Sequence, residues 1–465
     1  MNQKTETLFK SVYSNFYTRS GKRYPLPNGL HPNLLEFLKN RLEADSTTRI
    51  EDYETSRFPF NHGDFQYYFH NLYGDAGTVF LEDICDELDG DVIYIFPIEI
   101  KTTLESIRSD ITCSFDNQIC TYNVISSLPN KIIDLLQSKK IYLLLTLIHD
   151  PVFEEDVLKI VKFLEQYNIS SDRLHIVSAR DVKLENSNAM VYRGIMPLTK
   201  VAHEIDEQPS IRGLGYLSEY VAERDLDYEI IRPNKFLSFN RTARVHRIWL
   251  CYLAIKHNLL HNGLFSFIFP DRDISYFKSS MANIVSDDED LNKILSNMMV
   301  SLPYELDTFH LSDEEKGGFT TNNNKKDLYL DSYIHIVTET SFFETGVCYT
   351  EKIFRPMVNL QPFIVIGNAF SLKELRELGF KTFHPFINEE YDLITDPVQR
   401  MKKIEEELLR LNNMSINDMH ELYYSVKQIL MHNKNHIATY KNYNPFHIPL
   451  QNMKTTIKRG HHGNL

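Results

Sequence analysis

The sequence predicts an α/β protein built from two facing βαβ domains with a cleft between them. Three observations carry this prediction. The chain has 465 residues, more than one hydrophobic core usually holds, so two domains are expected. Short apolar runs alternate with helical patterns, which is typical of parallel sheets with crossover helices. A proline-marked turn at 231–234 separates two such series, and we place the domain boundary there.

The first series lies in residues 1–232. Apolar runs at 91–97 and 140–148 predict buried strands, and residues 174–178 predict a third. Helical spacing at 156–167 predicts a crossover helix between the second and third strands. These elements form the expected N-terminal domain.

The second series lies in residues 233–440, followed by a tail at 441–465. Gly379 is expected to close a helix in the left-handed conformation. Two N-terminal capping signals, at Asp396 with Pro397 and at Ser415 with Asp418, predict the last helices. Residues 314–326 are the most loop-like stretch. The expected strands are 235–240, 263–270, 333–338 and 362–367. The expected helices are 247–256, 350–358 and 371–378, the last of which follows the fourth strand.

Composition excludes some function classes. A net charge of −13 argues against unspecific nucleic-acid binding, which needs a basic surface. The cysteines are odd in number and never spaced C-x-x-C, so we expect reduced thiols. We find no signal peptide and no apolar run long enough to span a membrane, so we expect a cytoplasmic protein. The five cysteines are Cys85, Cys113, Cys120, Cys251 and Cys348.

The segment 339–356 (ETSFFETGVCYTEKIFRP) is the strongest candidate site. It follows a predicted buried strand, so it lies at the carboxyl edge of a parallel sheet, where ligands bind in open α/β folds. Thr350 is a good N-cap, and Lys352 adds a positive charge to the same helix end, which suits a diphosphate. Glu339 and Glu351 would accept hydrogen bonds from sugar hydroxyls. The alternative for Thr-Glu-Lys is ordinary capping with a solvated charge pair.

A basic triplet, Arg241, Arg244 and Arg247, follows the strand predicted at 235–240. Cations at a helix start oppose the helix dipole, so stability does not explain them. They would suit the phosphates of the same ligand. The alternative is a solvated basic helix start.

Segment 339–356 resembles the donor-binding motif of the α-1,3-fucosyltransferase family, F-E-N-S-x-x-x-D-Y-(V/I)-T-E-K. Glu339-Thr340-Ser341 is similar to E-N-S, and Thr350-Glu351-Lys352 matches T-E-K. Here the gap between the glutamates is two residues longer. The motif tyrosine falls on Cys348, with Tyr349 one place along.

That family also has an upstream S-N segment followed by an arginine that binds the donor phosphates. Ser238 and Asn240 resemble this segment, and Arg247 is the arginine whose position fits the spacing best. The similarity covers residues 235–367. The second half also resembles uncharacterised glycosyltransferase-like proteins of phages and bacteria, through the S-F-N-R…H-R, E-K-x-F-x-P and G-F-K-T-F segments.

The resemblance implies a GT-B-like fold of two Rossmann-like domains and an inverting transfer of a sugar to an acceptor hydroxyl, with no obligatory metal and no cofactor. The nucleotide-sugar, GDP- or UDP-linked, would be a co-substrate held by the C-terminal domain. The acceptor, a glycan, protein or modified nucleobase, would meet the N-terminal domain. The donor-binding candidates are Asn240, Arg241, Arg244, Arg247, Glu339, Glu344, Tyr349, Thr350, Glu351 and Lys352.

An inverting transfer needs a base for the acceptor hydroxyl. The candidates are Asp150 and His149, after the strand at 140–148, and Glu99, after the strand at 91–97. Two other classes stay open. Asp271 and Asp273 form a D-x-D, as in metal-dependent GT-A transferases. The chain could also be a non-catalytic nucleotide-binding or assembly protein.

Overall fold

The structure is a computed structural model. It describes residues 92–95, 112–115, 118–121, 130–147, 152–180, 182–185, 187–195, 197–198, 201–202, 220–227, 229–240, 243–267, 274–281, 284, 293–297 and 326–440. The chain divides into two compact units, one of Met1–Met196 with Asn444–Leu465 and one of Pro197–Tyr443. The predicted division between residues 232 and 233, and the cleft, stay predictions.

The first unit contains a parallel sheet of four strands in the order β1-β4-β5-β6. The central strands are rich in leucine and isoleucine, as is typical of strands buried on both faces. The three strands predicted here are confirmed. The strands are β1 (Val92–Ile95), β4 (Ile141–Leu147), β5 (Leu174–Ser178) and β6 (Met190–Arg193), and β2 (Thr112–Phe115) forms a separate antiparallel pair with β3 (Gln118–Thr121).

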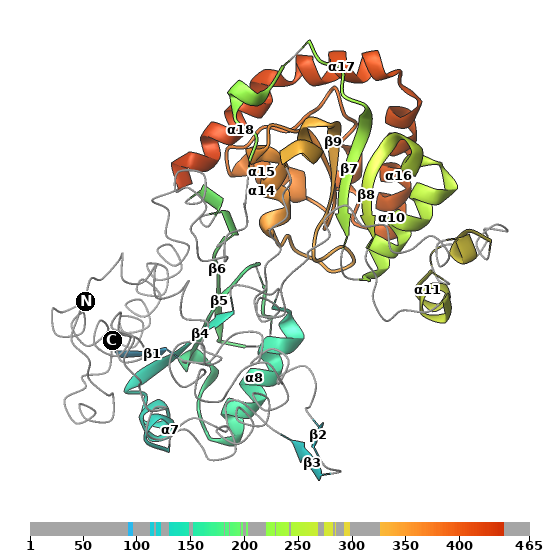
Figure 1. The fold of residues 1–465 in the computed structure, drawn as a ribbon. Coiled ribbons are helices and arrows are strands. Elements are labelled where there is room, and N and C mark those ends of the chain that lie inside the picture. Colours follow the sequence, from blue (N-terminus) through green and yellow to red (C-terminus); the bar gives the residue numbers. More distant parts are fainter. Residues whose placement is uncertain are drawn as a thin grey trace, which may run out of the picture. The chain divides into compact units, whose positions relative to one another are not determined.

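Helices precede and follow β4 in the first unit. Helix α7 (Asn130–Gln137) precedes β4, and α8 (Glu154–Gln166) connects β4 to β5 (Figure 1). Helix α8 begins two residues before the predicted start because Asp156 accepts a hydrogen bond from the Phe153 amide at 2.9 Å. This carboxylate satisfies an amide just ahead of the first turn.

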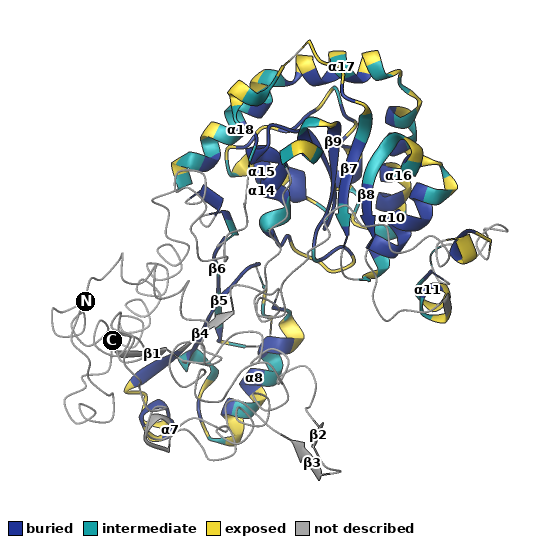
Figure 2. Ribbon diagram, in the orientation of Figure 1, coloured by how far each residue is buried: buried dark blue, intermediate teal, exposed yellow. Residues whose placement is uncertain are grey.

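The second unit contains a parallel sheet in the order β10-β9-β7-β8. All seven residues of β9 are buried, and in Figure 2 most of the second sheet is dark blue, whereas the starts of β7 and β8 are intermediate and exposed residues lie on helices and loops. Because the strands are parallel, their carboxyl ends lie at one edge. The strands are β7 (Asn234–Asn240), β8 (Gly263–Phe267), β9 (Ser332–Thr338) and β10 (Phe363–Ile366).

Helices α14 and α15 start at this carboxyl edge. Helix α14 (Glu351–Val358) follows β9, and α15 (Ser371–Glu377) follows β10. Gly379 has φ +90, as predicted for a left-handed cap, and a Cβ there would lie 2.7 Å from His436 Nε2. The other helices of this unit are α10 (Val245–Lys256), α11 (Ile274–Met281), α13 (Lys326–Leu330), α16 (Pro397–Asn413), α17 (Ile416–Ser425) and α18 (Lys427–Thr439).

The capping signals at Asp396 and Ser415 are confirmed, since each side chain accepts a hydrogen bond from an amide in its helix. Two helices of this unit differ from the prediction by more than one residue. Helix α10 begins at Val245, two residues early, and the last predicted helix is divided at Val426 into α17 and α18. In the loop-like stretch 314–326, residue Lys326 starts α13, and the rest lies outside the described residues.

Candidate functional site

The carboxyl ends of β7 and β9 are joined by a chain of side-chain hydrogen bonds. Thr338 Oγ1 donates to Asn240 Oδ1 at 2.7 Å, and Asn240 Nδ2 donates to Ser238 Oγ at 3.1 Å. Ser238 in turn donates to the Ile336 carbonyl at 2.9 Å. Asn240 is 1% exposed. Its buried side-chain amide links β7 to β9 and fixes the point from which the loops after both strands begin.

Glu339, directly after β9, is buried, and its carboxylate is hydrogen-bonded to groups of its own chain. Its carboxylate accepts from the Thr350 amide at 3.3 Å, from the Thr340 amide at 3.3 Å, and from the Thr350 hydroxyl. Burial raises the pKa of Glu339 above its ordinary value. This carboxylate therefore anchors the start of α14 from the end of β9.

Thr350 is the N-cap of α14, as predicted. Its hydroxyl accepts from the Lys352 amide at 3.4 Å, and the Lys352 ammonium also donates to it at 3.3 Å. The same hydroxyl donates to Glu339, so it uses both its donor and its acceptor capacity. The N-terminus of α14 is thereby held in one orientation.

Glu351 and Lys352 remain partly exposed at this helix start, at 14% and 26% of their side chains. Lys352 Nζ lies 3.1 Å from the Glu351 carboxylate, and Arg355 Nη2 lies 3.7 Å from it. Burial acts to raise the pKa of Glu351, but Lys352 and Arg355 outweigh it and lower the pKa to about 2. Glu351 is therefore an ionised acceptor at neutral pH.

Basic residues at the start of α10 bind the backbone of the loop after β9. Arg247 Nη2 donates to the carbonyls of Thr338 and Glu339 at 3.3 and 3.4 Å, and Arg244 Nη1 donates to the Thr340 carbonyl. Arg247 is 4% exposed, and burial lowers its pKa to about 10, so it stays charged at neutral pH. Arg244 is exposed, whereas Arg247 adds buried positive charge behind the loop.

His246 also binds this loop, and sequence reasoning missed it. Its Nε2 lies 2.9 Å from the Glu339 carbonyl, and its ring stacks on Phe342 with centroids 5.6 Å apart. Burial lowers the pKa of His246 to about 3, so the ring is neutral. Because a carbonyl only accepts, Nε2 carries the proton. The S-F-N-R…H-R segment was the signal that could have indicated it.

Glu344 and Tyr349 differ in exposure. Glu344 is exposed and accepts from the Phe342 amide at 3.1 Å. Tyr349 is buried, and its hydroxyl donates to the Ser371 carbonyl at 2.6 Å. This bond ties the approach to α14 to the first residue of α15, so Tyr349 joins the two helix starts.

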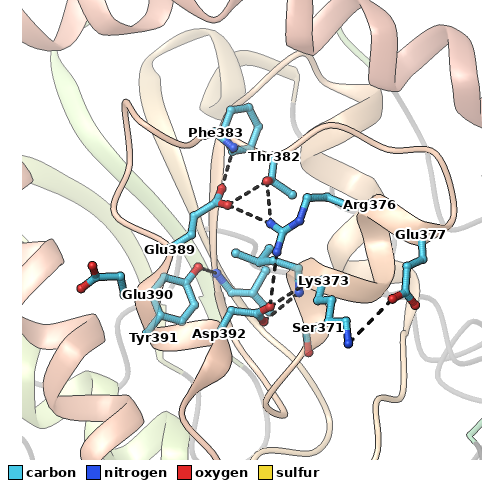
Figure 3. Close-up of polar contacts among 12 residues, drawn as sticks. Ser371, Lys373, Arg376, Glu377, Thr382, Phe383, Glu389, Glu390, Tyr391 and Asp392 are labelled. Carbon is cyan, nitrogen blue, oxygen red and sulfur yellow. Dashed lines mark hydrogen bonds and ion pairs between the residues drawn. The ribbon is translucent and has the colours of Figure 1, made fainter.

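A second polar cluster, also unpredicted, surrounds the start of α15 (Figure 3). Asp392 accepts from the amides of Leu372 and Lys373, each at 2.8 Å. Glu389 accepts from the Thr382 hydroxyl at 2.7 Å and from Arg376 Nη1 at 3.0 Å. The N-terminus of α15 is thus occupied by a carboxylate of the chain itself, and burial raises the pKa of Asp392 although the two amide hydrogen bonds act to lower it.

Several candidates lie outside the described residues. They are Glu99, His149, Asp150, Arg241, Asp271 and Asp273. Within the described ranges, no group of three or more His, Cys, Asp or Glu is arranged to hold a metal ion. Across the same part of the chain, no helix has the length and apolar character required to cross a membrane.

No family model and no curated protein matches the chain. Among solved structures, the trehalose-6-phosphate phosphatase N-terminal domain of Candida albicans is 10% identical, with a TM-score of 0.30 over 81% of this chain and 73% of that one. A UDP-forming alpha,alpha-trehalose-phosphate synthase of Burkholderia vietnamiensis is 10% identical, with a TM-score of 0.32 over 85% of each chain.

The chain is a mixed α/β protein with parallel sheets. The two structural similarities are too loose to carry an argument about its function. The resemblance to α-1,3-fucosyltransferases and to the phage and bacterial proteins stays a prediction from the sequence. A function therefore has to follow from the carboxyl edge of the second sheet.

Proposed function

We propose that this chain is a glycosyltransferase that takes a sugar from a nucleotide-sugar donor and transfers it, with inversion, to an acceptor hydroxyl. The observation that carries the proposal is the charge arrangement at the start of α14. Lys352 and Glu351 are partly exposed there, at the carboxyl edge of a parallel sheet. Such an edge is where open α/β sheets bind ligands, and a helix N-terminus favours anions.

The cations at this edge suit the donor's diphosphate. The Lys352 ammonium and the positive end of the α14 dipole would meet the phosphate oxygens. Arg244, exposed beside the Thr340 carbonyl, would add a second positive charge. Arg247 would act through its field, because its guanidinium already binds the carbonyls of the loop.

The two glutamates would have different tasks. Glu351 is ionised and partly exposed, so it can accept hydrogen bonds from hydroxyls of the ribose or of the transferred sugar. Glu339 is buried and bonded to Thr350, so it would position the helix start. Asn240 and Tyr349 would likewise hold the loop, and the exposed Glu344 remains available to the sugar.

In the transfer, the acceptor oxygen forms a bond to the donor's sugar carbon while the bond from that carbon to the diphosphate oxygen breaks. A base takes the hydroxyl proton, and the nucleoside diphosphate leaves. Lys352 would stabilise the charge that develops on this leaving group. The candidates for the base are Asp150, His149 and Glu99, as the sequence suggested.

The test is release of nucleotide from a panel of UDP-, GDP- and dTDP-sugars by the purified chain, with CMP-sugars as a monophosphate comparison. The proposal expects release of the diphosphate from at least one donor, in the presence of EDTA, and its loss in Lys352→Ala. Release that needs a divalent cation would favour a metal-dependent transferase using Asp271 and Asp273. Nucleotide binding without any release would favour a non-catalytic binding protein.

A further inference from the structure

Phe370 has an unusual backbone conformation at the carboxyl edge of the second sheet. Its φ is 69° and its ψ is 10°, in the left-handed region that a bulky side chain rarely adopts. The other non-glycine residues with positive φ in the described part of the chain each lie two residues after the last residue of an α-helix, where this conformation is common. They are Lys139, Asn168, Asn258 and Leu360.

Phe370 instead occupies the N-cap position of α15, where serine, threonine, aspartate and asparagine are preferred. A phenylalanine side chain cannot cap. The cap comes from Asp392, which accepts from the amides of Leu372 and Lys373 at 2.8 Å. The Phe370 amide donates to the Asp392 carbonyl at 2.6 Å, and its own carbonyl accepts from the Glu374 amide at 3.0 Å. The surrounding bonds thus hold Phe370 in an unfavourable conformation without using its ring.

The ring itself remains available. Phe370 is 37% exposed, one of the few large hydrophobic residues of the described chain with that much surface. Lys373 Nζ lies 5.7 Å from the ring centroid, on the first turn of the same helix (Figure 3 shows Lys373 beside Asp392). The ammonium group lies over the partly exposed ring as a cation–π partner, and it is also 3.9 Å from the Glu377 carboxylate.

Phe370 is close to the proposed donor site by direct connections. The next residue, Ser371, accepts the hydrogen bond of Tyr349, and Tyr349 precedes Thr350. A Cβ added at Gly367, three residues before Phe370, would lie 3.5 Å from the Glu339 side chain. The loop after β10 thus packs against the same residues that hold the start of α14.

We propose that Phe370 is the platform on which the base of the donor nucleotide stacks, with Lys373 donating to a carbonyl oxygen of that base. This rests on the proposed function. A nucleoside diphosphate carries its base one ribose away from the phosphates that Lys352 would bind. Nucleobases stack on aromatic side chains, and this stacking contributes substantially to binding.

Lys373 gives the platform a preference among bases. An ammonium group only donates hydrogen bonds, so it matches the carbonyl oxygens of uracil and guanine. Adenine offers no carbonyl oxygen, its exocyclic group donates, and its only acceptors are ring nitrogens. The proposal therefore expects UDP or GDP to bind more tightly than ADP.

The experiment is calorimetry of UDP, GDP, ADP and inorganic pyrophosphate with the full chain and with Phe370→Leu, Phe370→Tyr and Tyr424→Leu. Phe370→Leu should lower the affinity for the more tightly bound nucleotide by about tenfold or more, and it should leave the affinity for pyrophosphate unchanged. Phe370→Tyr should keep nucleotide affinity, since it keeps the ring. Tyr424, 54% exposed on α17, is the matched control, and Tyr424→Leu should change the affinity for neither nucleotide nor pyrophosphate.

Each other outcome contradicts the proposal in a distinguishable way. Unchanged nucleotide affinity in Phe370→Leu rules out stacking on this ring but leaves the proposed function standing. Equal losses for nucleotide and pyrophosphate show that Phe370 supports the loop instead of the base. If the parent chain binds neither nucleotides nor pyrophosphate, the proposed function fails and the inference fails with it.

Discussion

The Thr350 hydroxyl donates a hydrogen bond to the carboxylate of Glu339, and it also accepts from the Lys352 amide at 3.4 Å. One side chain therefore joins the residue after β9 to the first turn of α14. Everything proposed for the donor site depends on this connection, since it fixes where Lys352 and Glu351 lie relative to the sheet edge.

We predict that Thr350→Val lowers the free energy of unfolding by about 1–3 kcal/mol. The valine keeps the shape but removes the hydroxyl, so the buried Glu339 carboxylate has one donor fewer and the Lys352 amide is uncapped. Urea unfolding measures the change. Thr350→Ser should keep most of the parent's free energy of unfolding. Ser415→Ala, at an exposed N-cap, is the comparison. If Thr350→Val loses no more free energy of unfolding than Ser415→Ala, the bond to Glu339 contributes little.

Glu351→Gln should lower the free energy of unfolding mainly near neutral pH. The carboxyl's ordinary pKa of 4.5 is lowered to about 2 in the folded chain, so between these values the unfolded chain binds more protons. The stability that ionised Glu351 contributes is therefore complete above pH 4.5 and is lost as the pH falls toward 2.

The measurement is the difference in unfolding free energy between parent and Glu351→Gln, followed from neutral pH downward. The difference should shrink below pH 4.5. Glu377→Gln on α15, at an exposed carboxylate 3.9 Å from Lys373, serves as the comparison. A difference for Glu351 that does not change with pH would show that its charge does not stabilise the fold.

The neighbouring arginines of α10 should respond differently to replacement. Arg247→Met removes a buried donor to the carbonyls of Thr338 and Glu339, so we expect a loss of about 1–3 kcal/mol in unfolding free energy. Arg244→Met removes an exposed charge and a solvent-exposed hydrogen bond to the Thr340 carbonyl, and should cost about 0.5 kcal/mol or less. Equal costs from thermal or urea unfolding would contradict the role assigned to Arg247 in holding the loop.

The catalytic base is predicted from the sequence alone, in residues that the structure does not describe. Asp150→Asn should lower the transfer rate about 100-fold or more while donor affinity stays unchanged, because a base acts in the transition state. Single-turnover rates beside calorimetric affinities separate the two effects. Normal turnover would move the assignment to His149 or Glu99.

The parts of the fold that depend on local signals could be predicted. The apolar runs at 235–240 and 333–338 gave the central strands, and Thr350, Asp396 and Ser415 gave the helix starts. A strand or an N-cap needs only neighbouring residues, so its pattern is visible in the chain.

The partners of the site residues could not be predicted in the same way. The sequence predicts that Arg247 and Glu339 bind a ligand, and this stays a prediction; the bonds of the arginine to backbone carbonyls and of the glutamate to Thr350 were not predicted. Asp392 caps α15 from 20 residues along the chain. Such contacts depend on the paths of loops, which no local pattern specifies.

The central claim is that the start of α14 binds the diphosphate of a nucleotide, and calorimetry tests it most directly. UDP and GDP are titrated into the parent chain, Lys352→Ala and Lys403→Ala, the last removing an exposed α16 lysine that pairs with Glu406. We predict that the parent binds at least one of them, that Lys352→Ala loses about 1.5–3 kcal/mol, roughly 10- to 100-fold, and that Lys403→Ala loses nothing. No binding by the parent, or undiminished binding by Lys352→Ala, would contradict the claim.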